Sequence, residues 1–365
     1  MKQLGLMVIS KESWTDTRWA RKQWLPFYMA KRKQVGKIIY VDRHRAWWRS
    51  QTETKKVEEG VISVRQESLV IPFERMPFIR ALNRRIISWR LKPLLDPSLK
   101  WVVIYYHPYD VDLVKGLSGK AFTVFDWTED WAVFHGDDEM KALQQEAVMS
   151  SDMVLTVTES LRKKTLAWGK PASQAHTLLN ATTFTPEQAG DAAKEKPLPD
   201  VAGPRIGFVG HAGPWFDAGL ISRLAARHPD WQWIIAGGVG VNVREILGRH
   251  PSVHLLGIQP PSKLMPMMCG CDVLVAPYVP EFSGDATKLY DYLATGKPVI
   301  SAPCETAEQL QPFVTVCDGD EQWSLEISRA LTEDSADARQ TRMKESTRHH
   351  WNARVSRVLE LLGYD

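Results

Sequence analysis

The sequence predicts an α/β protein with two doubly wound parallel sheets, one in each half of the chain, both covered by helices. Short apolar runs alternate with amphipathic segments throughout, as expected for parallel strands joined by helical crossovers. The 365 residues are enough for two domains of ordinary size. A stretch rich in Pro, Ala and charge separates the two sets of runs and is typical of a linker. We expect a first domain at 1–185, a linker at 186–204, a second domain at 205–340 and a terminal helix at 341–365 that crosses back to the first domain.

The expected elements of the first half follow from its apolar runs, which are short enough for buried strands and are followed by segments of helical spacing. The strands are expected at 4–10, 37–41, 101–106, 121–126, 153–157 and 176–180, and the helices at 111–117, 137–150 and 159–168.

The second half repeats the pattern, with strands expected at 205–210, 231–237, 252–257, 272–277, 297–301 and 313–317. Both halves open with a strand followed by turns that contain glycine. Ligands of open α/β folds bind beyond the carboxyl ends of the strands. We therefore expect the two domains to face each other across a ligand-binding cleft.

Composition excludes several classes of protein. The apolar fraction of 44% and the charged fraction of 24% are those of a soluble globular chain, and a net charge of +3 argues against a nucleic-acid binder. All 4 cysteines lie in the second half without C-x-x-C or zinc-like spacing, which predicts buried reduced thiols and no metal. The amino-terminal apolar run is short and no run reaches transmembrane length, so we expect a cytoplasmic protein.

The stretch GDATKLYDYLATGKPVIS, residues 284–301, carries the clearest chemistry. A helix is expected from Thr287 to Thr295, ended by Gly296 and followed by a buried strand. Lys288 and Asp291 then share one helix face. The helix start and the Lys288 ammonium would bind a diphosphate, and the Asp291 carboxylate would accept hydrogen bonds from ribose hydroxyls. The alternative is a surface ion pair on an ordinary amphipathic helix.

This stretch resembles the donor-binding segment of GT-B glycosyltransferases, especially bacterial enzymes of exopolysaccharide and teichuronic-acid assembly, which carry a K-L-x-E-Y-L-A-x-G-K-P-V run. The resemblance implies the GT-B fold, in which two Rossmann-like domains face each other across a cleft. It also implies that Lys288 meets the diphosphate of the sugar nucleotide and that Asp291 holds its ribose. Asp291 stands where the family usually has Glu, and Ser283 stands where it usually has a first acid.

Two further loops of the second half are expected to contact the donor. Gly210, His211 and Gly213 lie between a strand and a helix, where glycines let the backbone approach a diphosphate. Their spacing is not the dinucleotide fingerprint, so a nicotinamide enzyme is not supported. His211 could equally cap a turn. The resemblance places the nucleobase near backbone groups at Ile258, which leaves the identity of the base open.

The acceptor side is predicted from the acidic loop FDWTEDWAVFHGDD, residues 125–138, which begins at the end of an expected strand. It resembles the Y-D-x-x-D-D-W segment of the same enzymes, and the matching positions are Asp126, Glu129 and Asp130. A base among them would favour inversion at the anomeric carbon. The alternative is an acidic loop that precedes and caps a helix. His107, at the end of another strand, is a further candidate for contact with acceptor or donor sugar.

The first half is also rich in Trp, Arg and Lys. Residues 76–92, MPFIRALNRRIISWRLK, have the composition of a helix at an anionic bilayer surface, which would suit a lipid-linked acceptor. A helix packed on its sheet with a solvated basic face explains the same pattern.

The sequence thus predicts a cytoplasmic glycosyltransferase that could work at the inner face of the plasma membrane. It would move a sugar from a nucleoside-diphosphate sugar to a saccharide or polyprenyl-linked glycan in cell-surface polysaccharide assembly. The nucleotide sugar is the co-substrate, and neither a cofactor nor a metal is expected, because Lys288 and the helix dipole can neutralise the leaving group. A catalytically inactive GT-B module and a sugar-nucleotide epimerase are the alternatives.

Overall fold

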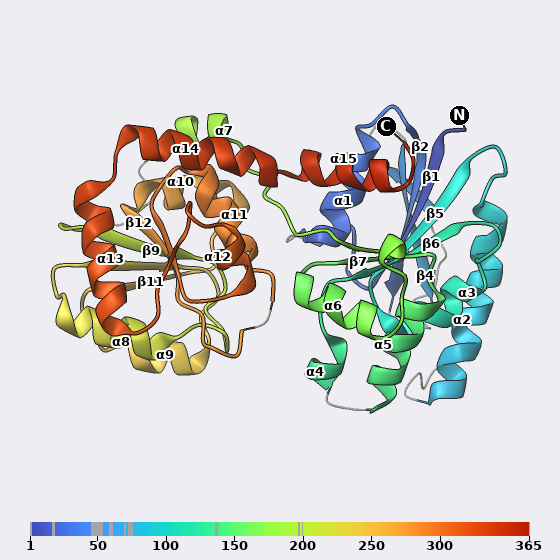
Figure 1. Ribbon diagram of the computed structural model, residues 1–365, viewed down its shortest axis with the longest axis horizontal. Helices are drawn as coiled ribbons and strands as arrows, with labels where there is room; N and C mark the ends of the chain where they lie inside the picture. Colours follow the sequence, from blue (N-terminus) through green and yellow to red (C-terminus); the bar gives the residue numbers. More distant parts are fainter. Residues whose placement is uncertain are drawn as a thin grey trace. The chain divides into compact units, whose positions relative to one another are not determined.

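The computed structural model divides the chain into two compact units (Figure 1). The first unit comprises Met1–Leu179 and Arg354–Asp365, and the second comprises Asn180–Ala353. The structure describes residues 2–16, 19–44, 54–57, 61–68, 71, 76–135, 138–195, 198, 200–282 and 284–364.

The first unit is built on an 8-stranded sheet in the order β3-β4-β2-β1-β5-β6-β7-β8. All of its pairings are parallel except that of β3 with β4. The chain leaves β1 toward β2 and later returns to the other side of β1 with β5, so the strand order reverses there. The strands are Leu4–Ser10, Val35–His44, Thr54–Val57, Ile62–Ser68, Lys100–Tyr105, Phe122–Trp127, Met153–Thr156 and Ala175–Thr177 for β1 to β8.

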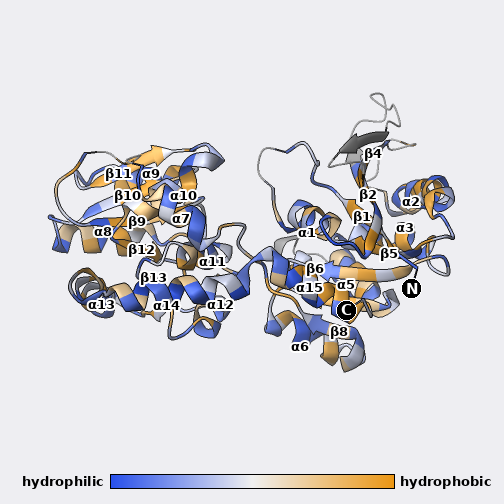
Figure 2. Ribbon diagram, turned by 90° about the horizontal axis from the view of Figure 1, so that it is seen from above, coloured by the Kyte–Doolittle hydropathy of each residue, from blue (hydrophilic) through white to orange (hydrophobic). Residues whose placement is uncertain are grey.

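The core of the first unit follows from strands that are buried on both faces. Every residue of β1 is buried, as expected for the near-continuous apolar run of a central parallel strand. One face of the sheet is covered by α2, α3 and α5, whose apolar side chains join those of the strands in a single cluster. Figure 2 shows hydrophobic residues concentrated on the strands. The helices are α1 (Arg21–Ala30), α2 (Pro77–Leu91), α3 (Val111–Lys115), α4 (Trp131–His135), α5 (Asp138–Ser150) and α6 (Glu159–Ala167).

The second unit contains a 6-stranded parallel sheet in the order β11-β10-β9-β12-β13-β14. Its order reverses between β9 and β12. The strands are Arg205–Val209, Gln232–Ala236, Val253–Gly257, Val273–Ala276, Val299–Ser301 and Thr315–Val316 for β9 to β14. The helices are α7 (Pro186–Ala192), α8 (Ala218–Arg227), α9 (Val241–Leu247), α10 (Pro261–Gly270), α11 (Thr287–Ala294), α12 (Glu305–Gln309), α13 (Asp320–Glu333) and α14 (Ala336–Ser346).

The predicted fold class is confirmed, because two parallel α/β sheets are present, but several elements differ from prediction. Strands β3 and β4 were not predicted, because Thr54–Val57 and Ile62–Ser68 lack a continuous apolar run and form the edge of the sheet. Helix α1 was not predicted either, since its sequence contains Pro26, which breaks the usual helical signal.

The chain also crosses between the units at positions other than those expected. The expected linker at 186–204 contains helix α7, which a Thr185 capping box begins and which contacts α10. The first crossing falls earlier, between Leu179 and Asn180. The expected terminal helix is divided into α14 and α15 (Trp351–Leu361), and its residues belong to the first unit from Arg354 onward.

Candidate functional site

The strand-order reversal of the second unit brings together the residues predicted to bind a donor. Gly210 follows β9, and Tyr278 lies just beyond β12, on the other side of the reversal. Helix α11 comes next in the chain and carries Lys288 and Asp291 in its first two turns. Ligands of doubly wound folds bind at such a reversal, beyond the carboxyl ends of the strands. The residues predicted to bind the donor therefore lie where a doubly wound fold usually binds its ligand.

Glycines at the strand ends let the backbone and the Lys288 side chain approach closely. Gly210 has a φ of +156° and Gly237 a φ of +138°. A Cβ atom on Gly210 would lie 2.0 Å from Lys288 Cε, and one on Gly237 would lie 1.9 Å from the Gly210 oxygen. The Gly210 amide donates to Ala236 O at 2.8 Å, and the Gly237 amide donates to Gly257 O at 2.7 Å. Only glycine fits at positions 210 and 237 without displacing the lysine or the neighbouring strand end.

The Lys288 ammonium lies among aromatic rings. Its Nζ is 5.3 Å from the centre of the Phe208 ring and 5.6 Å from that of Tyr278, within the range of cation–π attraction. Burial lowers the pKa of Lys288, and the carboxylate of Asp291 partly offsets this effect. Among the described residues, no carboxylate forms an ion pair with this ammonium. Lys288 is therefore a partly desolvated cation that is available to an anionic ligand.

Asp291 lies one helical turn beyond Lys288 and is also largely enclosed. Its Oδ1 accepts a hydrogen bond from the Thr182 hydroxyl at 2.6 Å. Burial raises the pKa of Asp291 to about 7, although the Thr182 hydroxyl and the Lys288 ammonium both lower it. A carboxylate can accept about four hydrogen bonds, so most of its capacity is left for ligand hydroxyls.

The start of α11 is held in place by side chains rather than by a standard cap, since Ala286 at the N-cap has no side-chain acceptor. Thr306 Oγ1 accepts from the Ala286 amide at 2.9 Å and donates to Asp285 Oδ1 at 2.8 Å. Asp285 Oδ1 also accepts from Tyr290 at 3.0 Å. Thr287, the first residue of the helix, is exposed. These bonds fix the direction of the first turn and of its positive dipole end.

The predicted loop residues after β9 lie at the same edge. His211 is exposed, and Cβ atoms on Gly213 and Gly238 would lie 2.6 and 2.8 Å from its ring nitrogens. The Ala212 amide donates to Gly238 O at 2.8 Å, so the loops after β9 and β10 are bonded to each other. The His211 ring thus rests on glycine backbone and remains accessible to a ligand.

Ile258 follows Gly257, the last residue of β11, and its side chain is 67% exposed. It lies at the carboxyl end of the outer strand of the same sheet. Ser283, which replaces the first acid of the family pattern, lies outside the described residues.

The strand-order reversal of the first unit gathers a second group of polar side chains. Glu12 follows β1 and forms an ion pair with Lys22 of α1. Lys22 Nζ lies 5.8 Å from the centres of both the Tyr106 and Trp131 rings. The Trp131 ring lies 4.5 Å from that of His107, which is 5% exposed and accepts a backbone hydrogen bond through Nδ1. An ammonium, a carboxylate and aromatic rings therefore lie close together at this reversal.

Asp126 does not have the geometry of a catalytic base, although the acidic loop predicted one among its residues. It is fully buried, and its two oxygens accept hydrogen bonds from Arg21 at 2.7 and 2.9 Å. Arg21 also donates to the carbonyl oxygens of Leu178 and Leu179 at 2.7 and 3.1 Å. The bidentate pair joins β6 to α1, and the carbonyl contacts of Arg21 join α1 to the segment after β8, so the pair has a structural role.

Asp130 is likewise engaged, whereas Glu129 is not. Asp130 accepts from Gln144 at 2.9 Å and forms an ion pair with Lys164 at 2.6 Å. The Glu129 side chain reaches solvent, and no described residue forms a hydrogen bond with its carboxylate. Desolvation by the surrounding protein raises the pKa of Glu129; Lys22 opposes this and Glu12 adds to it. Burial raises the pKa of Asp126 as well, against the effect of Arg21. Glu129 is therefore distinguished from the other two predicted acids by its free carboxylate.

Glu12, Lys22 and Thr182 were missed by the sequence reasoning. Glu12 lies two residues after the end of β1. The acidic loop was selected because it begins at the end of a strand, and the same criterion applied to β1 would have found Glu12. Lys22 belongs to the first half, for which only a general richness in Trp, Arg and Lys was noted. The Thr182 hydroxyl gives no sequence signal, since its role depends on the distant Asp291.

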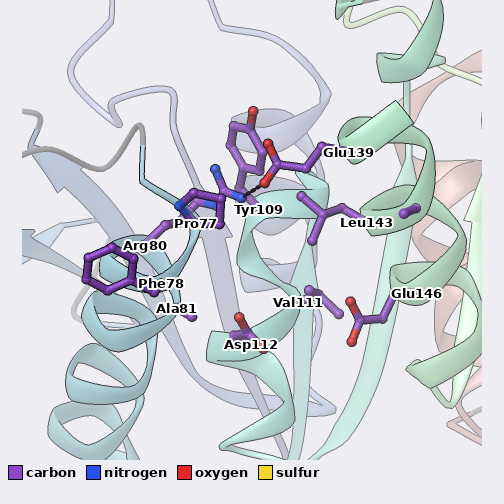
Figure 3. Close-up of a pocket in the computed structure, with 11 residues that line it drawn as sticks. Pro77, Phe78, Arg80, Ala81, Tyr109, Val111, Asp112, Glu139, Leu143 and Glu146 are labelled. Carbon is purple, nitrogen blue, oxygen red and sulfur yellow. Dashed lines mark hydrogen bonds and ion pairs between the residues drawn. The ribbon is translucent and has the colours of Figure 1, made fainter. Parts of the chain in front are cut away.

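A pocket of about 390 Å³ lies elsewhere on the first unit, between α2 and α5 (Figure 3). Its walls include Tyr109 and the ion pair between Arg80 and Glu139. Its remaining acids, Asp112 and Glu146, make it unsuited to a diphosphate. Within the described ranges, no three His, Cys, Asp or Glu side chains gather as a metal site would require. The four cysteines are buried and free.

The chain is similar to several known proteins. The family described as "Glycosyl transferases group 1" matches residues 203–333. The chain is 24% identical over 234 residues to TuaH of Bacillus subtilis (strain 168), which is named as a teichuronic acid biosynthesis glycosyltransferase. That match covers 61% of this chain and 56% of TuaH.

Solved structures resemble the whole chain. HepE of Anabaena in complex with UDP and glucose has a TM-score of 0.71 at 11% identity, over 98% of this chain and 99% of that one. Sucrose-phosphate synthase from Thermosynechococcus elongatus has a TM-score of 0.73 at 14% identity, over 99% and 98%. At such identities the likeness establishes the fold. Residues 203–333 thus match the group 1 glycosyl transferases, and the chain has the GT-B fold of these structures over its whole length.

Proposed function

We propose that the protein transfers a sugar from a nucleoside-diphosphate sugar to a saccharide or lipid-linked glycan in cell-surface polysaccharide assembly. The observation that carries this proposal is the Lys288 side chain lying against Gly210, with Asp291 one turn further along the same helix. A half-buried cation without a carboxylate partner favours a dianionic diphosphate, and a neighbouring carboxylate favours a ribose diol. The polysaccharide role is supported by the similarity to TuaH, and a uridine nucleotide by the complex of HepE with UDP.

In the proposed reaction the acceptor hydroxyl oxygen attacks the anomeric carbon of the donor. Glu129 accepts the hydroxyl proton, a new C–O bond forms, and the bond from the anomeric carbon to the diphosphate breaks. The electron pair of that bond stays on the diphosphate oxygen. Lys288 and the amino-terminal end of α11 stabilise the resulting charge, so the step needs no resident cofactor. Direct displacement of this kind inverts the anomeric configuration.

Glu129 is preferred as the base because its carboxylate is free, whereas Glu12 is paired. Burial alone would raise the pKa of Glu12, but Lys22 and Ser10 lower it below the usual value. A carboxylate with a lowered pKa is a weak base near neutral pH. Glu12 and Lys22 are placed instead to bind acceptor hydroxyls beside the aromatic wall of Trp131.

The Glu129→Gln variant is expected to lose turnover by about 10²- to 10⁴-fold, the usual contribution of a general base. Nucleotide affinity should be unchanged, because Glu129 belongs to the first unit and the donor residues belong to the second. Transfer from UDP sugars, measured as UDP release with a panel of saccharide acceptors, checks the first expectation. Calorimetric titration with UDP checks the second.

Glu146→Gln is a matched control, because this acid lies on the first unit and its exposed side chain pairs only with Lys115 among the described residues. Full turnover in Glu129→Gln would contradict the assignment of the base. Nucleotide binding by the wild type without any transfer would favour a catalytically inactive module. Conversion of the donor sugar in the absence of acceptor would favour an epimerase.

We also propose that the first unit contacts an anionic membrane through α2. No helix within the described ranges is long and apolar enough to cross a membrane, so contact would be at the surface. On α2, Phe78 is 69% exposed, Leu82 45% and Trp89 75%. They share one helix face with the exposed Arg85, and the helix contains no acidic residue. Apolar side chains beside a cation suit the headgroup region of an anionic bilayer, where a polyprenyl-linked acceptor would be held.

The double variant Phe78→Ser/Trp89→Ser is expected to lose most binding to vesicles of phosphatidylcholine and phosphatidylglycerol. Each aromatic residue adds about 2 kcal/mol when its apolar surface leaves water. Co-sedimentation measures the bound fraction. Leu325→Ser, which replaces a side chain that is 58% exposed on α13 of the second unit, is the control and should bind like the wild type. Equal binding by all three proteins would contradict a role for the α2 face.

A further inference from the structure

The segment that opens the second unit contacts the donor helix and its lead-in at two points. The Asn180 amide donates to Asp285 Oδ2 at 2.7 Å, just before α11. The Thr182 hydroxyl donates to Asp291 Oδ1 at 2.6 Å, within α11. A connecting segment is thus bonded both to the residue that precedes the helix and to the proposed ribose-binding carboxylate.

The Thr182 side chain has a fixed direction. The residue is 0% exposed, and its backbone pairs with the segment before α15: Thr182 N donates to His349 O at 2.9 Å, and Trp351 N donates to Thr182 O at 3.2 Å. Thr182 Oγ1 also accepts from the Phe184 amide at 3.0 Å. Because the hydroxyl oxygen accepts from Phe184, its single proton is donated to Asp291.

The bond from Thr182 determines which part of Asp291 is left for a ligand. Among the described residues, Thr182 is the sole hydrogen-bond partner of the Asp291 carboxylate, and it occupies Oδ1. Oδ2 and the second lone pair of Oδ1 stay available. Two adjacent ribose hydroxyls need two such acceptor positions in one plane. A carboxylate free to rotate about its terminal torsion would present them in many orientations.

We propose that Thr182 is a positioning residue for the nucleotide ribose, holding the Asp291 carboxylate in the plane in which it accepts the 2′ and 3′ hydroxyls together. The inference rests on the proposed function, since it requires a ribonucleotide ligand. It goes further by placing part of the ribose selectivity in a residue outside α11 that does not itself touch the ligand. The effect of Thr182 should therefore depend on the presence of the ribose hydroxyls.

The test compares UDP with 2′,3′-dideoxy-UDP in calorimetric titrations of the wild type and of Thr182→Val. Valine keeps the shape of threonine and removes the hydroxyl. We expect UDP to bind about tenfold more weakly to Thr182→Val, the effect of one buried hydrogen bond to a charged group. Affinity for the dideoxy nucleotide should change by less than about twofold, because that ligand does not use Asp291. Thr182→Ser, which keeps the hydroxyl, should restore UDP binding.

Thr295→Val is the matched control. Thr295 is a buried threonine at the other end of α11, where its hydroxyl donates to Tyr292 O at 2.6 Å. Its variant should affect stability without separating the two nucleotides. Equal weakening of UDP and dideoxy-UDP by Thr182→Val, or no weakening of either, would overturn the positioning role while leaving the proposed function in place. A wild type that binds neither UDP nor any other ribonucleoside diphosphate would overturn both.

Discussion

UDP-glucose is expected to bind about 10- to 100-fold more weakly to Lys288→Met than to the wild type, since a hydrogen bond to a charged group contributes roughly 1.5–3 kcal/mol. Methionine keeps the apolar stem that lies against Gly210 and removes the ammonium. In the wild type this cation is already partly desolvated, so a diphosphate gains its attraction without the full cost of stripping water from it. Calorimetric titration measures the loss.

Lys297→Met is the matched control, because Lys297 lies on the same segment, just before β13, and has no assigned contact with the donor. Its variant should bind UDP-glucose like the wild type. Folding of both proteins is compared by circular dichroism and thermal unfolding. Unchanged affinity in Lys288→Met, with the wild type binding normally, would refute the diphosphate contact on which the donor site depends.

The Arg21→Met variant is expected to destabilise the first unit by about 3–5 kcal/mol, the usual cost of leaving one partner of a buried ion pair uncompensated. The Arg21 and Asp126 side chains are 4% and 0% exposed, so water cannot replace the lost guanidinium. Arg21 also satisfies the carbonyl oxygens of Leu178 and Leu179, which would lose their donors. Hydrogen exchange of the β1 and β6 amides reports the loss separately from the second unit.

The double variant Arg21→Met/Asp126→Leu distinguishes a structural pair from a catalytic acid. Replacing both charges by apolar side chains removes the uncompensated carboxylate, and part of the stability should return. If Asp126 has only a structural role, transfer activity should return together with the stability. A stable double variant that binds UDP normally but has no transfer activity would contradict this reading and place Asp126 in the chemistry.

The positions of the candidate donor-binding residues could be predicted because they depend on neighbouring residues in the sequence. Helix spacing alone puts Lys288 and Asp291 on one face, and a strand followed by glycine predicts where Gly210 stands. The order of the strands, which creates the reversal at β9, depends on long-range pairing and was not predicted.

The acidic loop could not be resolved from sequence because its three acids differ only in their distant partners. Asp126 meets Arg21, 105 residues away, and Asp130 meets Lys164, 34 residues away. These partners engage the carboxylates of Asp126 and Asp130, and Glu129 is left as the free acid. Residue type alone does not distinguish the three. The same holds for Thr182, whose hydroxyl gains its role from Asp291, 109 residues further along the chain.

A crystal structure of the protein with bound UDP would show directly whether the donor site is where we propose. We expect the diphosphate beside Lys288 Nζ and the Gly210 loop, with the ribose hydroxyls on Asp291 and the base near the backbone at Ile258. A nucleotide bound elsewhere, or bound here with its diphosphate turned away from Lys288, would contradict the account.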